Sequence, residues 1–368
     1  MQPRSGKERG AVKRQVLVFG AGTGATNNLI RSLRAGDSAL GIVGCHNDRF
    51  FLRKSTSDRN FLIPRPDDQG FLSALHRLID VARIDLLIPN SDADVTLISG
   101  LREKIPCRVF LPSVRTIDIC QDKYTLTTLL CDRGVPAPAT FPVSDLDDIE
   151  GIFGRLTPRG QVWCRIKTGT GSMGATAVRT PAQARGWISY WEEMRGVPVT
   201  SFTLCEYLPG RDFACQSVWR NGTLLGMKAC ERLSYYGGAN RASGVSSTPA
   251  LAKTVVDHRV YEVRTAAIRA LDRDPSGVFS VDLKENADGT PCVTEINAGR
   301  FFMITNIFDL TGKHNLATTY VRAALEEPVD PFGVDDAVDD HYLVRDLDTL
   351  PDIFHADDLF SNIGETGA

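Results

Sequence analysis

Long apolar segments are missing from this sequence. No uninterrupted apolar run reaches the roughly 20 residues that a membrane-spanning helix requires. The first fifteen residues carry basic side chains but lack the apolar core of a secretory signal peptide. We therefore expect a cytoplasmic protein without a membrane partner.

Paired cysteines are missing as well. The nine cysteines are scattered and odd in number, and no two of them form a Cys-x-x-Cys pair. This pattern argues against both a disulfide framework and a zinc site. We expect most of these cysteines to be buried thiols, because free cysteine packs as a small apolar side chain.

An excess of positive charge is the third absence. Lys and Arg number 42 against 45 Asp and Glu, which gives a formal net charge of −3. A protein that binds nucleic acid through its surface charge carries a basic balance, so nucleic acid is not expected as a partner. Local basic clusters still suit a phosphorylated small molecule. A chain of 368 residues is long enough for two or three subdomains with cores of their own.

The segment 277–300 is typical of two strands joined by a turn, because β-forming side chains alternate on both sides of a run of turn residues. On such a hairpin Asp282 and Glu295 lie on paired strands, and Asn297 shares the face of Glu295. Two carboxylates and an amide suit Mg²⁺, which prefers oxygen ligands and completes its shell with water and nucleotide phosphates. A solvated hairpin whose acidic residues face water is the alternative for this motif taken alone.

Apolar strands alternate with amphipathic helices in the first third of the chain, which predicts a parallel, doubly wound sheet. The expected strands are 15–22, 39–45, 85–90 and 108–112. The expected helices are 26–36 and 71–83.

The first strand leads into a glycine turn. Gly20 to Ala25 fit the pattern G-x-G-x-x-A of dinucleotide-binding turns. The acidic residue expected about twenty positions later has no clean counterpart, since Asp48 lies too late. The glycines therefore mark either a dinucleotide site or only a tight turn from strand to helix.

A second region begins at about Thr116. One amphipathic helix ended by Gly134 is expected there, followed by a proline-rich connector at 135–138 and a charged, loop-prone stretch up to about Gly160. We place a domain boundary in this region.

Residues 162–180 predict a strand, a glycine loop and a second strand. In this loop Gly169, Gly171 and Gly174, with Ser172, would let successive backbone N–H groups approach phosphate oxygens. It differs from a Walker loop, which precedes a helix and ends in Gly-Lys-Ser/Thr. A plain flexible hairpin loop is the alternative.

The rest of the chain mixes strands, one long loop and helices. Strands are expected in 201–233, with Asn221-Gly222 as a hairpin turn. The polar loop 235–247 is too long for a structural turn and is a candidate lid or substrate loop. Helices are expected at 251–272 and before 325. The acidic end, 326–368, contains two short apolar pieces, YLV and DIF, that indicate partial docking, and a disordered end is the alternative.

In this order the motifs resemble the ATP-grasp superfamily, in particular the group related to carbamoyl-phosphate synthetase large subunits and D-alanine–D-alanine ligases. The resemblance covers residues 15–325. It implies an α/β domain with a doubly wound parallel sheet, the pre-ATP-grasp domain, and then an α+β ATP-grasp domain whose two lobes clamp ATP. The expected bounds are 1–14 for a flexible N-terminus, 15–115 for the pre-ATP-grasp domain, 116–325 for the ATP-grasp domain, with lobes at about 139–208 and 209–325, and 326–368 for the acidic segment.

The resemblance assigns the cofactor contacts. Lys123 is similar to the first nucleotide-binding lysine of the family, and either Arg165 or Lys167 takes the role of the second basic residue. Asp212 stands where relatives have a ribose-binding glutamate. The other expected ATP contacts are the glycine loop and the adenine hinge, namely Gly169, Gly171, Ser172, Met173, Gly174, Glu206, Tyr207 and Leu208. Asp282, Glu295 and Asn297 match the family's Mg²⁺ ligands in type and spacing, and Mn²⁺ is a potential substitute.

The resemblance also implies the chemistry. A carboxylate is activated with ATP as an acyl phosphate, which needs positioning and charge neutralisation more than covalent help. Arg232, Arg300 and Lys167 are the expected catalytic residues. A guanidinium fork suits a substrate carboxylate. The expected substrate contacts are Gly22, Asp92, Tyr235, Tyr236, Arg241 and Arg300.

Four functions compete at this point. The favoured one is an ATP-dependent ligase that couples a small carboxylic acid or amino acid to an amine or to a thiol. The sequence does not decide whether the protein forms a homodimer. A carbamoyl-phosphate-type or carboxylase-type enzyme would use bicarbonate instead. An NAD-binding oxidoreductase built on the first glycine turn would not hydrolyse ATP. A nucleotide sensor without catalysis would not need the complete oxygen triad.

Overall fold

The computed structural model describes residues 14–156, 160–241, 243–334, 336 and 338–345, together with the backbone of a short strand at 365–366. The expected flexible N-terminus, apart from Arg14, lies outside the described residues, and so does the apolar piece DIF near the other end. Among the described residues, no helix combines the length and the apolarity needed to cross a bilayer.

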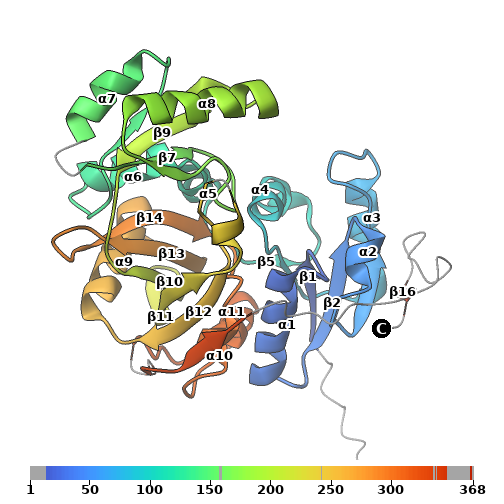
Figure 1. The fold of residues 1–368 in the computed structure, drawn as a ribbon. Coiled ribbons are helices and arrows are strands. Elements are labelled where there is room, and N and C mark those ends of the chain that lie inside the picture. The colour runs from blue at the N-terminus through green and yellow to red at the C-terminus, as the bar shows by residue number, and fades with distance from the viewer. Residues whose placement is uncertain are drawn as a thin grey trace, which may run out of the picture.

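The N-terminal domain is built on a six-stranded sheet of order β16-β3-β2-β1-β4-β5. All strands run parallel except β16, which is antiparallel to β3. This confirms the predicted doubly wound sheet (Figure 1). The strands are β1 (Gln15–Phe19), β2 (Gly41–His46), β3 (Arg59–Leu62), β4 (Leu86–Ile88), β5 (Arg108–Val109) and β16 (Glu365–Thr366).

Helices cover both faces of this sheet because side chains alternate along its buried strands. Val16 and Val18 pack with α1 on one face, and Leu17 and Phe19 pack with α3 and α4 on the other. The helical segments are α1 (Gly24–Gly36), α2 (Arg49–Leu52), α3 (Phe71–Ala82), α4 (Asp92–Leu101) and the 3-10 turn η1 (Arg102–Lys104).

Two helices connect this domain to the lobes, where the sequence predicted one. They are α5 (Val114–Gln121) and α6 (Lys123–Asp132). The break occurs at Asp122, whose extended backbone and side chain cap α6 by accepting from the N–H of Thr125. This cap places Lys123 at the first position of α6, while Gly134 follows the helix in a left-handed conformation.

The small lobe is a four-stranded antiparallel sheet of order β6-β9-β7-β8. Its apolar core lies between the sheet and helices α7 and α8 (Figure 1). The predicted loop-prone stretch before Gly160 was wrong in part, since it forms β6 and α7, whose apolar side is buried. The elements are β6 (Thr140–Pro142), α7 (Asp148–Leu156), β7 (Val162–Ile166), β8 (Thr176–Val178), α8 (Pro181–Arg195), η3 (Val199–Ser201) and β9 (Phe202–Glu206).

The large lobe is a six-stranded antiparallel sheet of order β14-β13-β10-β11-β12-β15. Asn221 and Gly222 have positive φ and form the predicted hairpin turn between β10 and β11. The predicted helix at 251–272 begins only at His258, because 251–255 belong to β12, paired with β11 and β15. The elements are β10 (Asp212–Arg220), β11 (Thr223–Tyr235), η4 (Gly238–Asn240), β12 (Pro249–Val255), α9 (His258–Leu271), β13 (Gly277–Glu285), β14 (Pro291–Ala298), α10 (Asn306–Asp309), α11 (Leu316–Ala324) and β15 (Tyr342–Val344).

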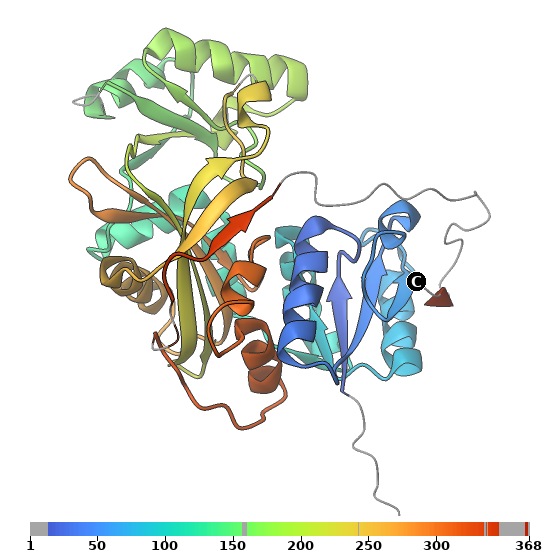
Figure 2. The same cartoon turned by 60° about the horizontal axis from the view of Figure 1, so that its bottom comes forward.

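The large lobe lies against the N-terminal domain through α10 and α11, which contact α1 (Figure 2). The apolar piece YLV of the acidic segment is β15 at the sheet edge, so the predicted partial docking is confirmed for this piece. The three parts surround a common cavity.

Candidate functional site

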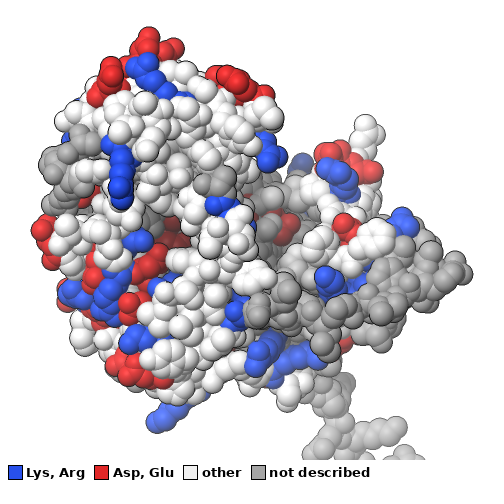
Figure 3. Space-filling view, viewed as in Figure 1, with Lys and Arg blue, Asp and Glu red and all other residues white. Residues whose placement is uncertain are grey.

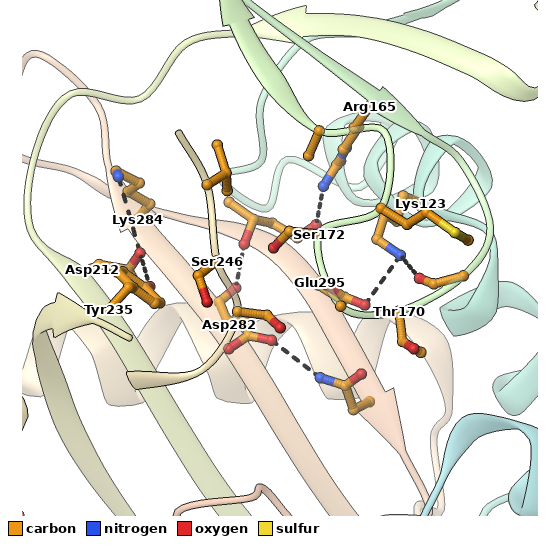
Figure 4. A pocket seen from close by; sticks show the side chains of 18 of the residues that line it. Lys123, Arg165, Thr170, Ser172, Asp212, Tyr235, Ser246, Asp282, Lys284 and Glu295 are labelled. Atoms are coloured by element: carbon orange, nitrogen blue, oxygen red, sulfur yellow. Dashed lines mark hydrogen bonds and ion pairs between the residues drawn. The ribbon is translucent and has the colours of Figure 1, made fainter. Parts of the chain in front are cut away.

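A cavity of about 600 Å³ lies between the two lobes and reaches the N-terminal domain. Its walls come from β7, the glycine loop, β9, β13 and β14, and from the start of α4 and α6 (Figure 4). Most of the residues expected from the sequence line it. These are Asp92, Lys123, Arg165, Gly169, Gly171, Ser172, Met173, Glu206, Tyr207, Leu208, Asp212, Arg232, Tyr235, Asp282, Glu295, Asn297 and Arg300.

The predicted hairpin is formed by β13 and β14, which pair Asp282 directly with Glu295. Asn297 lies two residues further along β14 and donates from Nδ2 to Asp282 Oδ2 at 3.1 Å. All three side chains line the cavity, so the two carboxylates and the amide converge as the alternation of the strands predicted.

A β-bulge adjusts this pairing. After the pair Asp282 and Glu295 the register moves to Leu283 and Val293, so Thr294 has no opposite residue on β13, although its hydroxyl donates to the carbonyl oxygen of Asp282 at 3.1 Å. The carbonyl oxygen of Thr294 instead accepts from Arg165 Nη1 at 3.1 Å. The bulge therefore connects the small lobe to the strand that carries Glu295.

Protein cations contact each of the three oxygen ligands. Lys123 Nζ lies 3.1 Å from Glu295 Oε1 and donates to the carbonyl oxygen of Gly169 at 2.8 Å. Arg232 pairs with Asp282, and Arg300 Nη2 donates to Asn297 Oδ1. The oxygen set is thus held in place by basic side chains that a nucleotide phosphate would also attract.

The donor set fits a divalent cation. Burial raises the pKa of Asp282 to about 6, with Arg232 opposing this shift and the Glu295 carboxylate adding to it. Although burial also raises the pKa of Glu295, Lys123 and Arg300 hold it below the ordinary value. A bound cation would stabilise the ionised form of two facing carboxylates, one of which has a raised pKa. Among the described residues no cluster of three His, Cys, Asp or Glu side chains competes for a metal.

The glycine loop between β7 and β8 is a chain of left-handed residues. Gly169, Gly171 and Gly174 have φ of +112°, +74° and +68°, and Ser172 has φ of +58°. A serine in this region is uncommon, and such backbones cluster at ligand sites. Residues of positive and negative φ are interspersed in this loop, a backbone pattern that is typical of anion-binding nests.

Arg165 is the clearest anion-binding group in the cavity. It is buried, and its Nε and Nη2 have no hydrogen-bond partner while Nη1 binds Thr294. A buried guanidinium with unused donors costs free energy unless a ligand accepts from it. Of the two basic residues expected here, Arg165 lines the cavity and Lys167 does not.

Both carboxylate oxygens of Asp212 already have protein partners. Its Oδ1 accepts from Arg232 Nη1 at 3.1 Å, its Oδ2 accepts from Tyr235 Oη at 2.7 Å, and Lys284 Nζ lies 4.0 Å away. The pairing of β10 with β11 and β13 sets these contacts, because Arg232 and Lys284 lie directly opposite Asp212. Asp212 therefore orients Arg232 rather than presenting a free carboxylate.

Five expected residues do not line the cavity. Gly174 packs against Ile166, and its carbonyl oxygen accepts from the indole of Trp187. Arg241 is exposed. The remaining residues outside the lining are Gly22, Lys167 and Tyr236.

Sequence reasoning missed several lining residues. Asn90 and Ser91 follow β4, and the carboxyl end of a strand in a doubly wound sheet is a signal that could have found them. Phe302, Met303 and Ile304 carried no such signal, because apolar residues are common in any core.

The first glycine turn is filled by protein. A Cβ at Gly22 would lie 1.7 Å from the carbonyl oxygen of Phe51, so α2 occupies the position from which a pyrophosphate would approach this glycine. This supports the interpretation of the turn as a tight strand-to-helix connection.

We expect Gly22→Ala to lower the melting temperature without changing nucleotide affinity. The new Cβ must displace the Phe51 backbone at a position with φ of +89°, which costs about 1–3 kcal/mol. Gly24→Ala is the matched control, because nothing lies within 4 Å of its Cβ. Thermal unfolding and titration with a fluorescent ATP analogue measure the two effects. Loss of ATP binding in a folded Gly22→Ala protein would contradict this interpretation.

Comparisons with known proteins identify the fold. No protein-family model and no curated protein matches the chain. Among solved structures, L-amino acid ligase from Bacillus licheniformis matches with a TM-score of 0.64 and 14% identity, over 86% of this chain and 75% of the ligase. Carboxyaminoimidazole ribonucleotide synthase from Aspergillus clavatus, complexed with ATP, matches with a TM-score of 0.62 and 14% identity, over 88% of this chain and 80% of the synthase.

A third structure has the same fold. The biotin carboxylase domain dimer of Hydrogenobacter thermophilus 2-oxoglutarate carboxylase, in complex with MgADP, ADP and bicarbonate, matches with a TM-score of 0.65 and 14% identity, over 89% of this chain and 73% of the domain. These neighbours are ATP-grasp enzymes that differ in their reactions. This chain therefore has the ATP-grasp fold, with a pre-ATP-grasp α/β domain followed by two antiparallel-sheet lobes.

Proposed function

We propose that this chain is an ATP-dependent ligase that activates a small carboxylic acid or amino acid as an acyl phosphate and couples it to an amine or a thiol, with Mg²⁺ as its metal. Mn²⁺ is an alternative metal. The observation that carries this proposal is one cavity in which the oxygen triad of Asp282, Glu295 and Asn297 lies beside two cations. They are Lys123, 3.1 Å from Glu295, and the buried, partly unpaired Arg165 (Figure 4).

The cavity suggests how ATP would lie. The segment Glu206–Leu208, at the end of β9, would hold the adenine edge. Arg165, Lys123 and the N–H groups of the glycine loop would bind the phosphates. Asp282, Glu295 and Asn297 would hold Mg²⁺, which would stabilise the negative charge that develops on the transferred phosphoryl group. The fold neighbours complexed with ATP and MgADP support this assignment.

The chain's own residues would do the rest by positioning and charge. An oxygen of the acid attacks the terminal phosphorus of ATP, the bond to ADP breaks, and an acyl phosphate forms. The amine or thiol then attacks the acyl carbon, phosphate leaves, and the nucleophile loses its proton. Arg232 and Arg300 lie beside the triad, where they would stabilise the negative charge of both steps.

The surface agrees with a small-molecule substrate. On the face in Figure 3, acidic and basic side chains are interspersed, without a broad basic area. Such a surface does not favour nucleic acid as the substrate.

A phosphate-release screen tests the proposal. With ATP and Mg²⁺, we expect release that depends on adding both an acid and a nucleophile, from pools of amino acids and other carboxylates supplied with and without amines and thiols. Bicarbonate is included as a separate acid, because two of the fold neighbours are a carboxylase domain and a carboxyaminoimidazole ribonucleotide synthase. Release with bicarbonate alone would replace the ligase by a carboxylase-type enzyme. Oxidation of a pooled substrate with NAD and no ATP turnover would reject the proposal.

A further inference from the structure

One end of the cavity lies where the N-terminal sheet meets the large lobe. Ala25 follows β1, and Asn90, Ser91 and Asp92 follow β4, at the carboxyl ends of neighbouring strands. From β1 the sheet continues to β2 on one side and β4 on the other. Such a switch point opens a crevice that binds ligands in α/β sheets. The triad borders this end through Asn297, whose Oδ1 accepts from Arg300 Nη2.

An ion pair joins the two sides of the crevice. Arg300, which follows β14, donates to both carboxylate oxygens of Asp92 at the start of α4, with Nη2 and Oδ2 separated by 3.3 Å. Both side chains are partly exposed, 18% and 25%. A ligand with an ammonium and a carboxylate on one carbon can take the place of Arg300 as the partner of Asp92 and the place of Asp92 as the partner of Arg300. Its carboxylate accepts from Arg300, its ammonium donates to Asp92, and no charge is left without a partner.

A second acceptor lies beside Asp92. Asn90 is 6% exposed and donates from Nδ2 to Thr26 Oγ1 at 3.3 Å. The hydroxyl of Thr26 donates to the carbonyl oxygen of Phe19 at 2.9 Å, so it can only accept from Asn90. This fixes the amide orientation. Asn90 Oδ1 is left buried without a partner, which favours a ligand that brings a donor. An ammonium group has three N–H donors.

Apolar side chains complete this end of the cavity. Ala25, Phe302 and Ile304 line it, and Met303 is 36% exposed at its edge. These residues offer no partner to a second charge on the ligand. An apolar side chain therefore fits this wall.

We propose that the acid substrate is an α-amino acid with an apolar side chain, whose carboxylate binds Arg300 beside the oxygen triad and whose ammonium binds Asp92 and Asn90. The proposal rests on the proposed ligase function and selects amino acids from the small carboxylic acids. Asp92 and Asn90 determine this specificity.

Binding of matched ligands tests the proposal. The full chain, with Mg²⁺ and a non-hydrolysable ATP analogue, is titrated with a pool of leucine, valine, methionine and phenylalanine, and then with the best of them. The deaminated acid and the decarboxylated amine of that compound serve as probes. We expect each probe to bind at least about 30-fold more weakly, because each leaves one half of the ion pair without its partner. Phosphate release with ATP should follow the same order.

Asp92→Asn should bring the preference for the amino acid over the deaminated acid down to a few-fold, while circular dichroism shows a folded protein. Asp118→Asn, on the exposed side of α5, is the matched control and should keep the full preference. Equal binding of amino acid and deaminated acid, or an unchanged preference in Asp92→Asn, would overturn the proposal. Turnover with non-amino carboxylates alone would overturn the amino acid specificity but would still agree with the ligase function. Tight amino acid binding without ATP turnover would count against the ligase instead.

Discussion

Glu295→Gln is expected to lower ATP-dependent phosphate release at least about 100-fold. The substitution keeps the shape of the side chain but removes a negative charge from the two carboxylates that face each other across β13 and β14. It also removes the ion pair with Lys123, whose Nζ keeps the carbonyl oxygen of Gly169 as an acceptor. The assay is phosphate release with saturating acid, amine, ATP and Mg²⁺.

Binding measurements separate the metal role from a general defect. Mn²⁺ affinity, followed by electron paramagnetic resonance, should fall in Glu295→Gln, while the melting temperature stays close to that of the parent chain. Asp282→Asn should lower turnover more than nucleotide affinity, and equal losses would count against a role in the transition state. Glu262→Gln, on the exposed side of α9, is the matched control and should leave all readouts unchanged. Intact turnover in Glu295→Gln would refute the metal assignment.

Lys228→Met is expected to produce the largest loss of stability, about 3–5 kcal/mol for the region that it holds. Lys228 is 3% exposed, and its Nζ donates to the carbonyl oxygens of Phe308, Thr311 and His314 at 2.9, 2.8 and 2.7 Å. It also pairs with Asp336 at 2.9 Å. Methionine fills a similar volume, but it leaves three carbonyls without their donor and the buried Asp336 carboxylate without its cation. Thermal unfolding and limited proteolysis of the segment after α10 measure the effect.

An exposed ion pair provides the control. Lys253→Met removes a pair with Asp340, whose side chain is 70% exposed, and should cost less than about 1 kcal/mol. Equal effects of the two substitutions would contradict the prediction.

The effect of Lys228→Met should also depend on pH. Although burial raises the pKa of Asp336, the hydrogen bonds from Lys228 and from the N–H groups of His314 and Lys313 hold it below its usual value near 3.8. The stability from this carboxylate is therefore complete above that value and is lost as the pH falls through the lower pKa of the folded state. The difference in melting temperature between the parent chain and Lys228→Met should shrink below about pH 4.

Local patterns predicted the parts of the fold that depend on near neighbours. Strands rich in β-branched residues, the Asn221-Gly222 turn and the hairpin around Asp282 are all present, because backbone propensity and alternation act over a few residues. The prediction failed where tertiary pairing decided. Residues 251–255 have helical spacing, but they form a strand because β11 and β15 pair with them.

The sequence by itself determined the hairpin that carries the oxygen triad and the glycine loop, since each lies within one short segment whose geometry follows from residue type and spacing. Tertiary structure alone decided that Lys123 reaches Glu295, that Arg165 binds the bulged strand, and that Arg300 meets Asp92 from 208 positions away. Such contacts depend on how separate domains pack, and no local propensity encodes the distance between side chains on different domains.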